Sequence, residues 1–140
     1  ACHAPAPSTG GGSGAARGRV GDSPIPGAGV WPDDRVAVSC TGKGEAFLRA
    51  VAAHDVSARI RYAGVDLDQA ARAVIAEVGR RGGDGGLIAV DRSGRIVMPF
   101  DTPGMKRASI TSSEPLRVGS VGPQLRDAPP GGTAHRTDGT

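Results

Sequence analysis

The chain has 140 residues, among them 23 glycines and 11 prolines but only 26 large apolar residues (Val, Ile, Leu and Phe), which predicts one small domain with a modest core. Its net charge of +3 and its four scattered aromatic side chains exclude a basic, base-stacking surface, so we expect no nucleic-acid partner. No stretch approaches the length of a membrane span, and the N-terminus lacks the basic-then-apolar order of a signal peptide, so we expect no membrane partner and a cytoplasmic location.

The two ends of the chain differ in composition from its middle. Residues 1–18 are rich in Gly, Pro, Ala and Ser and show no periodicity, which predicts a loop or linker. Residues 109–140 hold four prolines and few large apolar side chains, which predicts a disordered tail. The folded domain is therefore expected over residues 19–108.

Within this domain the apolar pattern first predicts a strand and two helices. The strand is Val36–Cys40, and a glycine-rich turn leads from it into a helix over about residues 45–62. Gly64 ends this helix. Asp66 then caps a second helix, with Gln69 three residues later in a capping-box arrangement.

A β-hairpin follows the second helix. Its strands are Leu87–Asp91 and Arg95–Phe100, with Ser93–Gly94 as the turn between them. This order of elements predicts an α+β fold, with helices on one face of a mainly antiparallel sheet. Because three strands with an uncovered face are too thin to stand alone, we expect further strands from another chain or from an N-terminal part.

Cysteine and histidine are too sparse for a metal centre. Cys2 and Cys40 form no close pair, and the three histidines are scattered, so the ligand spacing of a zinc site is absent. We expect neither a metal nor a cofactor.

The first candidate for a ligand site is the glycine-rich segment 18–24, which holds Arg19 and Asp22 three residues apart. Arg19 can bind an α-carboxylate through two hydrogen bonds, and Asp22 can bind an α-ammonium group. The pair therefore suits the zwitterionic head of a free amino acid or the amino-acid end of a dipeptide. The alternative is a salt bridge within a turn.

The second candidate is the turn Cys40–Glu45, between the first strand and the first helix. The hydroxyl of Thr41 and exposed backbone N–H groups could stabilise an oxyanion, as in an amidase. The alternative is a plain helix start, with Gly42 as the cap and Glu45 at the third helical position. Ser8–Gly11 is a third candidate, which by itself has the composition of a linker.

Taken together, three segments resemble the plant-type asparaginase and isoaspartyl-peptidase family. They are Ser-Thr-Gly-Gly from Ser8, Gly-Arg-Val-Gly-Asp-Ser-Pro from Gly18 and Ser-Cys-Thr-Gly-x-Gly-Glu from Ser39. The likeness continues through the hairpin and Phe100–Arg107, and covers about residues 8–108.

The resemblance implies a hydrolase in which a threonine attacks the side-chain amide of L-asparagine or of a β-aspartyl dipeptide and forms an acyl-enzyme. It also implies the four-layer αββα sandwich of the N-terminal-nucleophile hydrolases, of which this chain supplies only part.

The resemblance implies a role for each matched residue. Thr9 would hydrogen-bond the nucleophile, Thr41 and Gly42 would form the oxyanion hole, and Arg19 and Asp22 would bind the substrate's α-carboxylate and α-ammonium. The implied catalytic residues are Thr9, Thr41 and Gly42, and the implied substrate-binding residues are Arg19, Val20, Gly21, Asp22, Thr41, Gly42, Lys43 and Gly44.

Two parts of the family pattern fall outside this sequence. In the family the nucleophile lies about 18 residues before the position of Thr9, where this chain has only eight residues. Cys2 stands at the wrong spacing to replace it. The α-subunit is absent as well, so the expected partners are a small-molecule substrate and an α-subunit or N-terminal part, in a heterotetramer typical of the family.

Three alternatives to a working asparaginase stay open. The chain could be a non-catalytic remnant that binds aspartate-like ligands, or it could pair with a separately encoded chain that carries the nucleophile. It could also belong to the glycosylasparaginase branch, which shares the Gly-Arg-Val-Gly-Asp-Ser-Pro block. Glu45 stands where that branch tends to have Asp, which favours the isoaspartyl-peptidase side.

Overall fold

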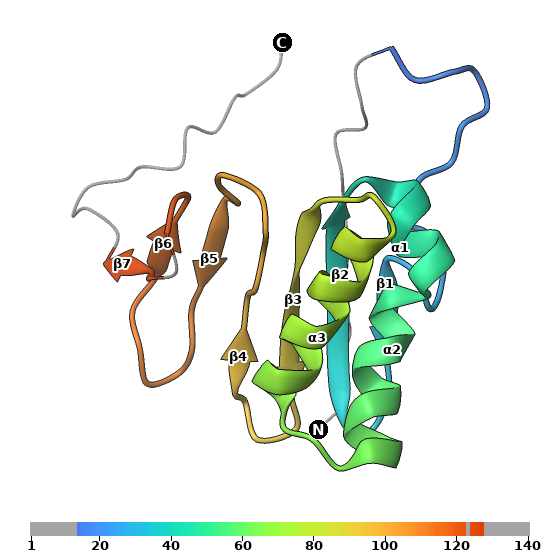
Figure 1. Cartoon of the computed structure of the whole chain (residues 1–140). Coiled ribbons are helices and arrows are strands. Elements are labelled where there is room, and N and C mark those ends of the chain that lie inside the picture. The colour runs from blue at the N-terminus through green and yellow to red at the C-terminus, as the bar shows by residue number, and fades with distance from the viewer. Residues whose placement is uncertain (1–13, 123, 128–140) are drawn as a thin grey trace, which may run out of the picture. The chain divides into compact units, whose positions relative to one another are not determined.

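The computed structural model describes residues 14–122 and 124–127. The chain divides into two compact units, of which the first ends at Pro103 and the second begins at Gly104. Among the described residues, the first unit holds a four-stranded sheet and all the helices, and the second holds a three-stranded sheet (Figure 1).

The first unit is an antiparallel sheet with helices on one face (Figure 1). Its strands, in spatial order, are β1 (Val30–Pro32), β2 (Val36–Gly42), β3 (Gly85–Asp91) and β4 (Ile96–Val97). Its helices are α1 (Gly44–Ala50), α2 (Ala52–Ala58) and α3 (Leu67–Arg80), and a π-helical turn, Arg59–Ala63, follows α2. None of these helices is long and apolar enough to cross a membrane.

The strands alternate between the helix-covered face of the sheet and the opposite face. In β2 the side chains of Val36, Val38 and Cys40 are buried, whereas Ser39 between them is only partly buried. Ser39 pairs with Ile88 of β3, which is exposed. The α+β fold with a mainly antiparallel sheet is therefore confirmed.

The strand β1 is one that the sequence did not predict. It has three residues and ends in Pro32, and Trp31 at its centre pairs with Val38 of β2. It forms an edge of the sheet, where proline is tolerated because no strand on the outer side needs its missing N–H. The sheet consequently has four strands instead of the predicted three.

The first predicted helix is interrupted at Val51, so the expectation of one continuous helix is wrong. Val51 has a left-handed backbone with φ 49° and separates α1 from α2. The break frees N–H groups in the first turn of α2, and those of Ala53 and His54 donate to the carbonyls of Ala28 and Gly27 at 3.0 and 2.9 Å. The loop before β1 therefore replaces the lost helical hydrogen bonds, which no local pattern reveals.

The other helix ends follow the sequence. Gly64 has φ 66° and ends the helical turn after α2. The carboxylate of Asp66 caps α3 by accepting a hydrogen bond from the N–H of Gln69 at 3.0 Å. Both predicted boundaries are confirmed.

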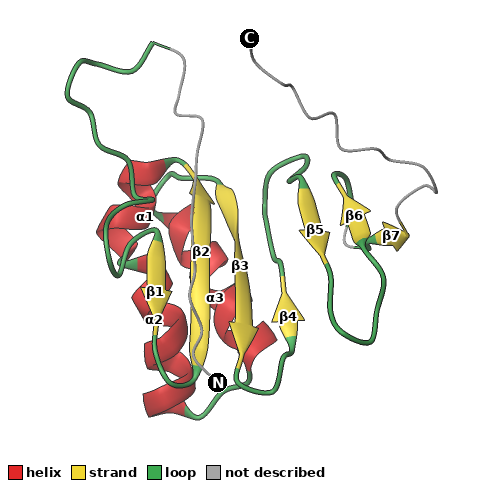
Figure 2. Cartoon of the chain, turned by 180° about the vertical axis from the view of Figure 1, so that it is seen from behind, coloured by secondary structure: helices red, strands yellow, loops and turns green. Residues whose placement is uncertain are grey.

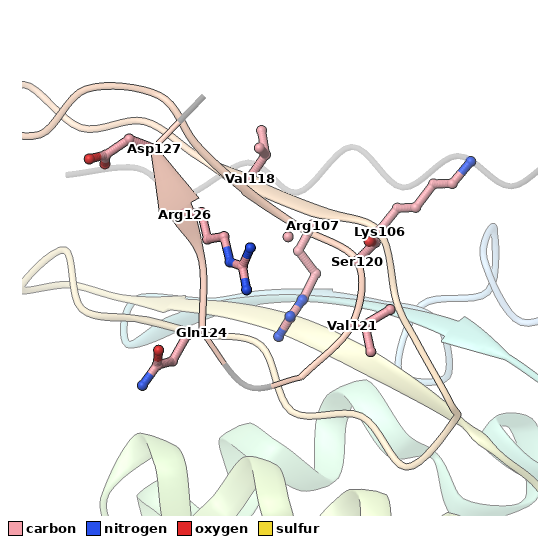
Figure 3. A pocket seen from close by; sticks show the side chains of 9 residues that line it. Lys106, Arg107, Val118, Ser120, Val121, Gln124, Arg126 and Asp127 are labelled. Carbon is pink, nitrogen blue, oxygen red and sulfur yellow. The ribbon is translucent and has the colours of Figure 1, made fainter. Parts of the chain in front are cut away.

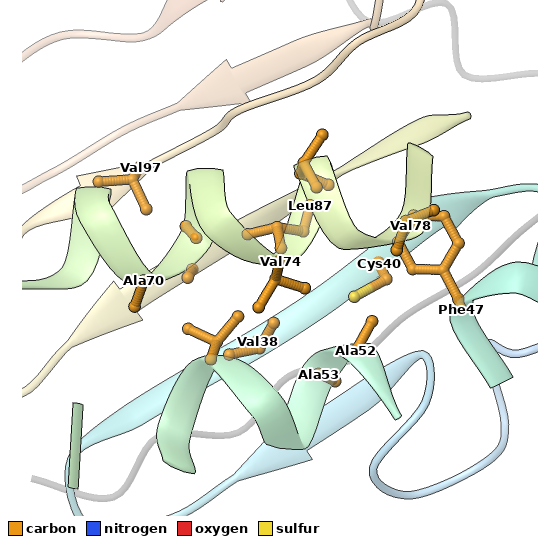
Figure 4. Close-up of a cluster of buried hydrophobic side chains, with 14 of the residues drawn as sticks. Val38, Cys40, Phe47, Ala52, Ala53, Ala70, Val74, Val78, Leu87 and Val97 are labelled. Atoms are coloured by element: carbon orange, nitrogen blue, oxygen red, sulfur yellow. The ribbon is translucent and has the colours of Figure 1, made fainter. Parts of the chain in front are cut away.

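The core of the first unit lies between the helices and the sheet (Figure 4). Phe47 of α1, Val74 and Val78 of α3, and Leu87 of β3 are fully buried there. Where α2 meets α3, four alanines are fully buried: Ala52, Ala53, Ala70 and Ala71. Small side chains let the two helices approach closely, which explains how few large apolar residues can fill this core.

The opposite face of the sheet carries no helix among the described residues (Figure 2). Ile88, at the centre of β3, is 43% exposed on this face. An aliphatic side chain in the middle of a sheet is usually packed against another layer, and among the described residues of the first unit no helix supplies one on this face.

The second unit contains three short antiparallel strands, β5 (Arg107–Ser109), β6 (Arg117–Gly119) and β7 (Arg126–Asp127). The structure thus differs from the predicted organisation, in which the domain ends at residue 108 and a disordered tail follows. β6 and β7 lie within the segment assigned to that tail. Backbone hydrogen bonds join these strands, and two or three residues are too few to show an apolar alternation.

Val51 provides a test of backbone strain between α1 and α2. A β-branched residue in the left-handed region costs about 1–2 kcal/mol, and the Val51 side chain is 47% exposed, so it contributes little packing. We expect the free energy of unfolding of Val51→Gly to exceed that of Val51→Ala by about 1 kcal/mol in urea denaturation. Both variants lack the valine side chain, and only alanine keeps a Cβ. A glycine variant no more stable than the alanine variant would contradict this strain.

A partly buried network joins α2 to the turn between β1 and β2. Oδ1 of Asp33 accepts hydrogen bonds from the N–H groups of Arg35 and Val36 at 2.8 and 2.9 Å. Its Oδ2 accepts from Trp31 Nε1 at 3.1 Å and from the hydroxyl of Ser57. Burial raises the pKa of Asp33, but these hydrogen bonds outweigh burial and hold its pKa below the ordinary value.

This lowered pKa makes the contribution of Asp33 to stability depend on pH. The carboxylate stabilises the fold above its unfolded pKa of about 3.9, and the contribution is lost as the pH falls through the lower folded value. Asp33→Asn should therefore lower the free energy of unfolding by about 1–2 kcal/mol at pH 7, and by less at pH 3, in urea denaturation. Asp34→Asn, at the exposed neighbouring carboxylate, is the control with little expected effect. An equal loss for Asp33→Asn at both pH values would refute this role.

Candidate functional site

Two segments far apart in the sequence meet at the start of α1. The loop before β1 carries Arg19 and Asp22 and reaches the N-terminus of α1, where Gly44 and Glu45 lie (Figure 1). Arg19 Nε donates a hydrogen bond to Glu45 Oε1 at 3.0 Å, and Arg19 Nη2 lies 3.0 Å from the same oxygen. The first two predicted ligand segments therefore form one site, which we call the clamp: Arg19, Asp22, Gly44 and Glu45.

Asp22 is the buried member of the clamp. Asp22 is only 4% exposed. Its Oδ2 is buried and accepts no hydrogen bond from the described residues. Burial raises the pKa of Asp22 and outweighs the backbone N–H groups and the charge of Arg19, which lower it. A buried carboxylate is stable as an anion only beside a cation or hydrogen-bond donors, so Asp22 is suited to receive a positively charged group.

Gly44 leaves the space in which the clamp is assembled. A Cβ at this position would lie 2.8 Å from Asp22 Oδ1 and 3.1 Å from Arg19 Nη2. Gly21 acts similarly on the other side of the guanidinium, since a Cβ there would lie 3.3 Å from Arg19 Nη1. The two glycines thus allow the charged groups to approach the backbone closely.

Thr41 and Gly42 end β2 just before the clamp, and both are exposed. Gly42 has φ 143°, and a Cβ there would meet the carbonyl oxygen of Asp84 at 2.2 Å, so only glycine fits. The cap of α1 is Lys43, with φ −73°, and Glu45 is the second helical residue. The alternative in which Gly42 caps the helix is therefore wrong, because Gly42 is still paired with β3.

The side chain of Lys43 is directed to another part of the chain. Its Nζ donates to the carbonyl of Gly82 at 3.0 Å, and its backbone N–H donates to the carbonyl of Asp84 at 3.0 Å. Both bonds attach the turn before α1 to the loop between α3 and β3. Val20 is exposed beside the clamp, and Thr9 lies outside the described residues.

Cys40 is buried at the end of β2, within the electrostatic reach of Asp22. Burial raises the pKa of its thiol well above the ordinary value, and the charge of Asp22 raises it further. The thiol is therefore neutral and poorly nucleophilic. In residues 14–122 and 124–127, no three His, Cys, Asp or Glu side chains gather in a way that could hold a metal ion.

Glu45 is the member of the site that sequence reasoning did not identify. The sequence indicated only its place near the start of a helix and its value as a family marker. An acidic residue in the first helical turn is common for helix stability alone, so its position carried no signal of a contact with Arg19, 26 residues away.

A hollow of about 730 Å³ lies in the second unit, and none of its lining residues is a predicted site residue (Figure 3). Arg107 of β5, Val118 of β6 and Arg126 of β7 are among the residues that line it. Its lining belongs to residues 106–127, so it is a feature of the second unit.

Comparisons with known proteins bear on this geometry. The family model described as asparaginase matches residues 3–119. The isoaspartyl peptidase of Escherichia coli K12 is 50% identical over 107 residues, which are 75% of this chain and 33% of that protein. A putative isoaspartyl peptidase/L-asparaginase of Dictyostelium discoideum is also 50% identical over 107 residues, or 76% of this chain and 31% of that protein.

A plant-type L-asparaginase of Pyrobaculum calidifontis is 39% identical over 93 residues, which are 64% of this chain and 31% of that protein. The chain thus spans about a third of the length of the curated relatives that it matches. The segments that form the clamp lie within the matched region. On the extent of this match, the chain belongs to the asparaginase family.

Proposed function

We propose that the clamp binds the zwitterionic head of L-asparagine or of a β-aspartyl dipeptide, and that the protein containing this chain hydrolyses the side-chain amide of that ligand. The observation that carries the proposal is the buried Oδ2 of Asp22, which has no hydrogen-bond donor among the described residues although Arg19 lies close by. An α-ammonium group supplies both the charge and the donors that this oxygen lacks.

Arg19 supports the second half of the ligand head. Glu45 engages two nitrogens of the guanidinium through a single oxygen. A guanidinium has five N–H groups, so donors remain for an α-carboxylate. With Arg19 on the carboxylate and Asp22 on the ammonium, the side chain of the ligand is held in one orientation.

The chemical step in this proposal uses a threonine outside the present sequence. Its Oγ attacks the side-chain carbonyl carbon, the C–N bond breaks, and ammonia or the peptide amine leaves with a proton. Water then cleaves the resulting ester and releases aspartate. Thr41, through its hydroxyl, and Gly42, through its N–H, are proposed to stabilise the oxyanion, and Thr9 to hydrogen-bond the nucleophile.

The uncovered face of the first sheet fits the same proposal. We assign this face, with Ile88 at its centre, to contact with a second sheet in a four-layer αββα sandwich. An α-subunit or N-terminal part of the protein would supply that second sheet, in a heterotetramer. The length of the relatives, about three times that of the matched segment, is consistent with this assignment.

Hydrolysis by the full-length protein tests the proposed function. We expect release of aspartate from L-asparagine or from a β-aspartyl dipeptide, and Arg19→Ala should lower kcat/KM about a hundredfold, because about 3 kcal/mol of charge-assisted binding is lost. Arg72→Ala, which removes an exposed ion pair with Asp68 on α3, is the matched control and should leave activity unchanged. Binding of L-asparagine without release of aspartate would support the non-catalytic remnant, and equal activity of both variants would refute the clamp.

Asp22→Asn should separate ligand binding from stability. Burial raises the pKa of Asp22 in the folded state, so its protonated form contributes fully to the free energy of unfolding below the unfolded pKa of about 3.9. This contribution is lost as the pH rises through the folded pKa, because the buried carboxyl group then becomes charged. At pH 7 the variant should therefore be more stable by about 1 kcal/mol, or roughly 4 °C in Tm, yet bind L-asparagine at least about tenfold more weakly. Thermal unfolding at pH 7 and pH 4 measures the first effect, which should shrink at pH 4.

Asp68→Asn, on the exposed face of α3, is the control for loss of a carboxylate. A variant at position 22 that is less stable than the unaltered chain at pH 7 would show that the buried charge is already compensated within the protein.

A further inference from the structure

We infer that Glu45 makes the clamp selective for zwitterions, because it fixes the guanidinium of Arg19 and adds a negative charge that repels carboxylates without an α-ammonium group. The inference rests on the proposed function and goes beyond it by naming the residue that discriminates amino acids from acids lacking the α-amine.

Glu45 orients the guanidinium of Arg19. Oε1 of Glu45 lies 3.0 Å from both Nε and Nη2, so one edge of the guanidinium is occupied. The opposite nitrogen, Nη1, lies against Gly21. The hydrogen bond and charge of Glu45 raise the pKa of Arg19, and the hydrogen bond from Arg19 lowers the pKa of Glu45, so the pair is fully charged. Held in this way, Arg19 presents its remaining N–H groups in one direction.

The charged residues of the clamp do not balance. Arg19 contributes one positive charge, whereas Asp22 and Glu45 contribute two negative charges. A carboxylate without an α-ammonium group is attracted by Arg19 but repelled by the net negative charge of the clamp. A zwitterion carries no net charge and places its ammonium near the two carboxylates. Coulomb interactions over a few ångströms at a partly exposed site are strong enough to change affinity severalfold.

Lys43 is a further charged group that acts on Glu45. Its ammonium is bound to the carbonyl of Gly82, in the loop between α3 and β3, so its charge is held outside the clamp. Asp22, by contrast, is buried and acts at close range. The balance of charge that a ligand meets is therefore set by the three charged clamp residues.

Three matched amides test the inference on the full-length protein by NMR titration. L-asparagine is the zwitterion, succinamate lacks the α-amine and carries a negative charge, and 3-aminopropanamide lacks the α-carboxylate and carries a positive charge. We expect Glu45→Gln to raise the affinity for succinamate about fivefold and to lower that for 3-aminopropanamide by a similar factor. The affinity for L-asparagine should change less than about threefold. The same spectra show any aspartate that forms.

The variants distinguish charge from structure. Glu45→Ala should change the ratio of L-asparagine to succinamate affinity in the same direction as Glu45→Gln, and Glu45→Asp, which keeps the charge, should preserve the ratio. Glu77→Gln, at a carboxylate of α3 paired with Arg80 and Arg81, is the matched control for loss of a surface charge and should preserve it too.

Each outcome decides between the two proposals. Binding of L-asparagine with an unchanged ratio in Glu45→Gln and Glu45→Ala overturns the inference and leaves the proposed function intact. Failure of the unaltered chain to bind L-asparagine overturns both. In the absence of ligand, the Nε–H signal of Arg19 should exchange with water severalfold faster in Glu45→Gln than in Glu77→Gln, and equal exchange overturns the positioning role of Glu45.

Discussion

The close approach of the loop before β1 to the start of α1 is the contact on which the site depends. It brings a guanidinium and a buried carboxylate against the backbone of a helix, and it is possible because Gly44 has no side chain. Any Cβ at that position would occupy the space of Asp22 Oδ1. The chemistry of the clamp therefore follows from a steric condition at one residue, to which the charges of Arg19 and Asp22 are then added.

The same loop is attached to the fold at two further places. The carbonyls of Gly27 and Ala28 receive the N–H groups that the break at Val51 frees in α2, and the carbonyl of Gly29 receives the N–H of Cys40 in β2. These bonds fix a segment that contains little apolar material of its own. A glycine-rich loop can thus hold charged groups in place because its backbone, and not its side chains, supplies the attachment.

The clamp combines an exposed ion pair with a buried carboxylate, and these two parts make different contributions. The pair of Arg19 and Glu45 is 32% and 48% exposed, so it adds little stability and serves mainly to orient. Asp22 is costly to bury, since its Oδ2 has no donor among the described residues. In the proposed site this carboxylate stays without a donor until an ammonium group binds, which favours function over stability.

Local patterns in the sequence were enough to predict the alternation of β2, the caps at Gly64 and Asp66, the hairpin, and the motifs that resemble the asparaginase family. These depend on residues within a few positions of each other, so a linear pattern contains them. It did not reveal the short strand β1, the break at Val51, the strands β6 and β7 or the contact of Glu45 with Arg19. These features depend on tertiary contacts, because hydrogen bonds and ion pairs between residues far apart in the sequence stabilise conformations that local preference disfavours or does not decide.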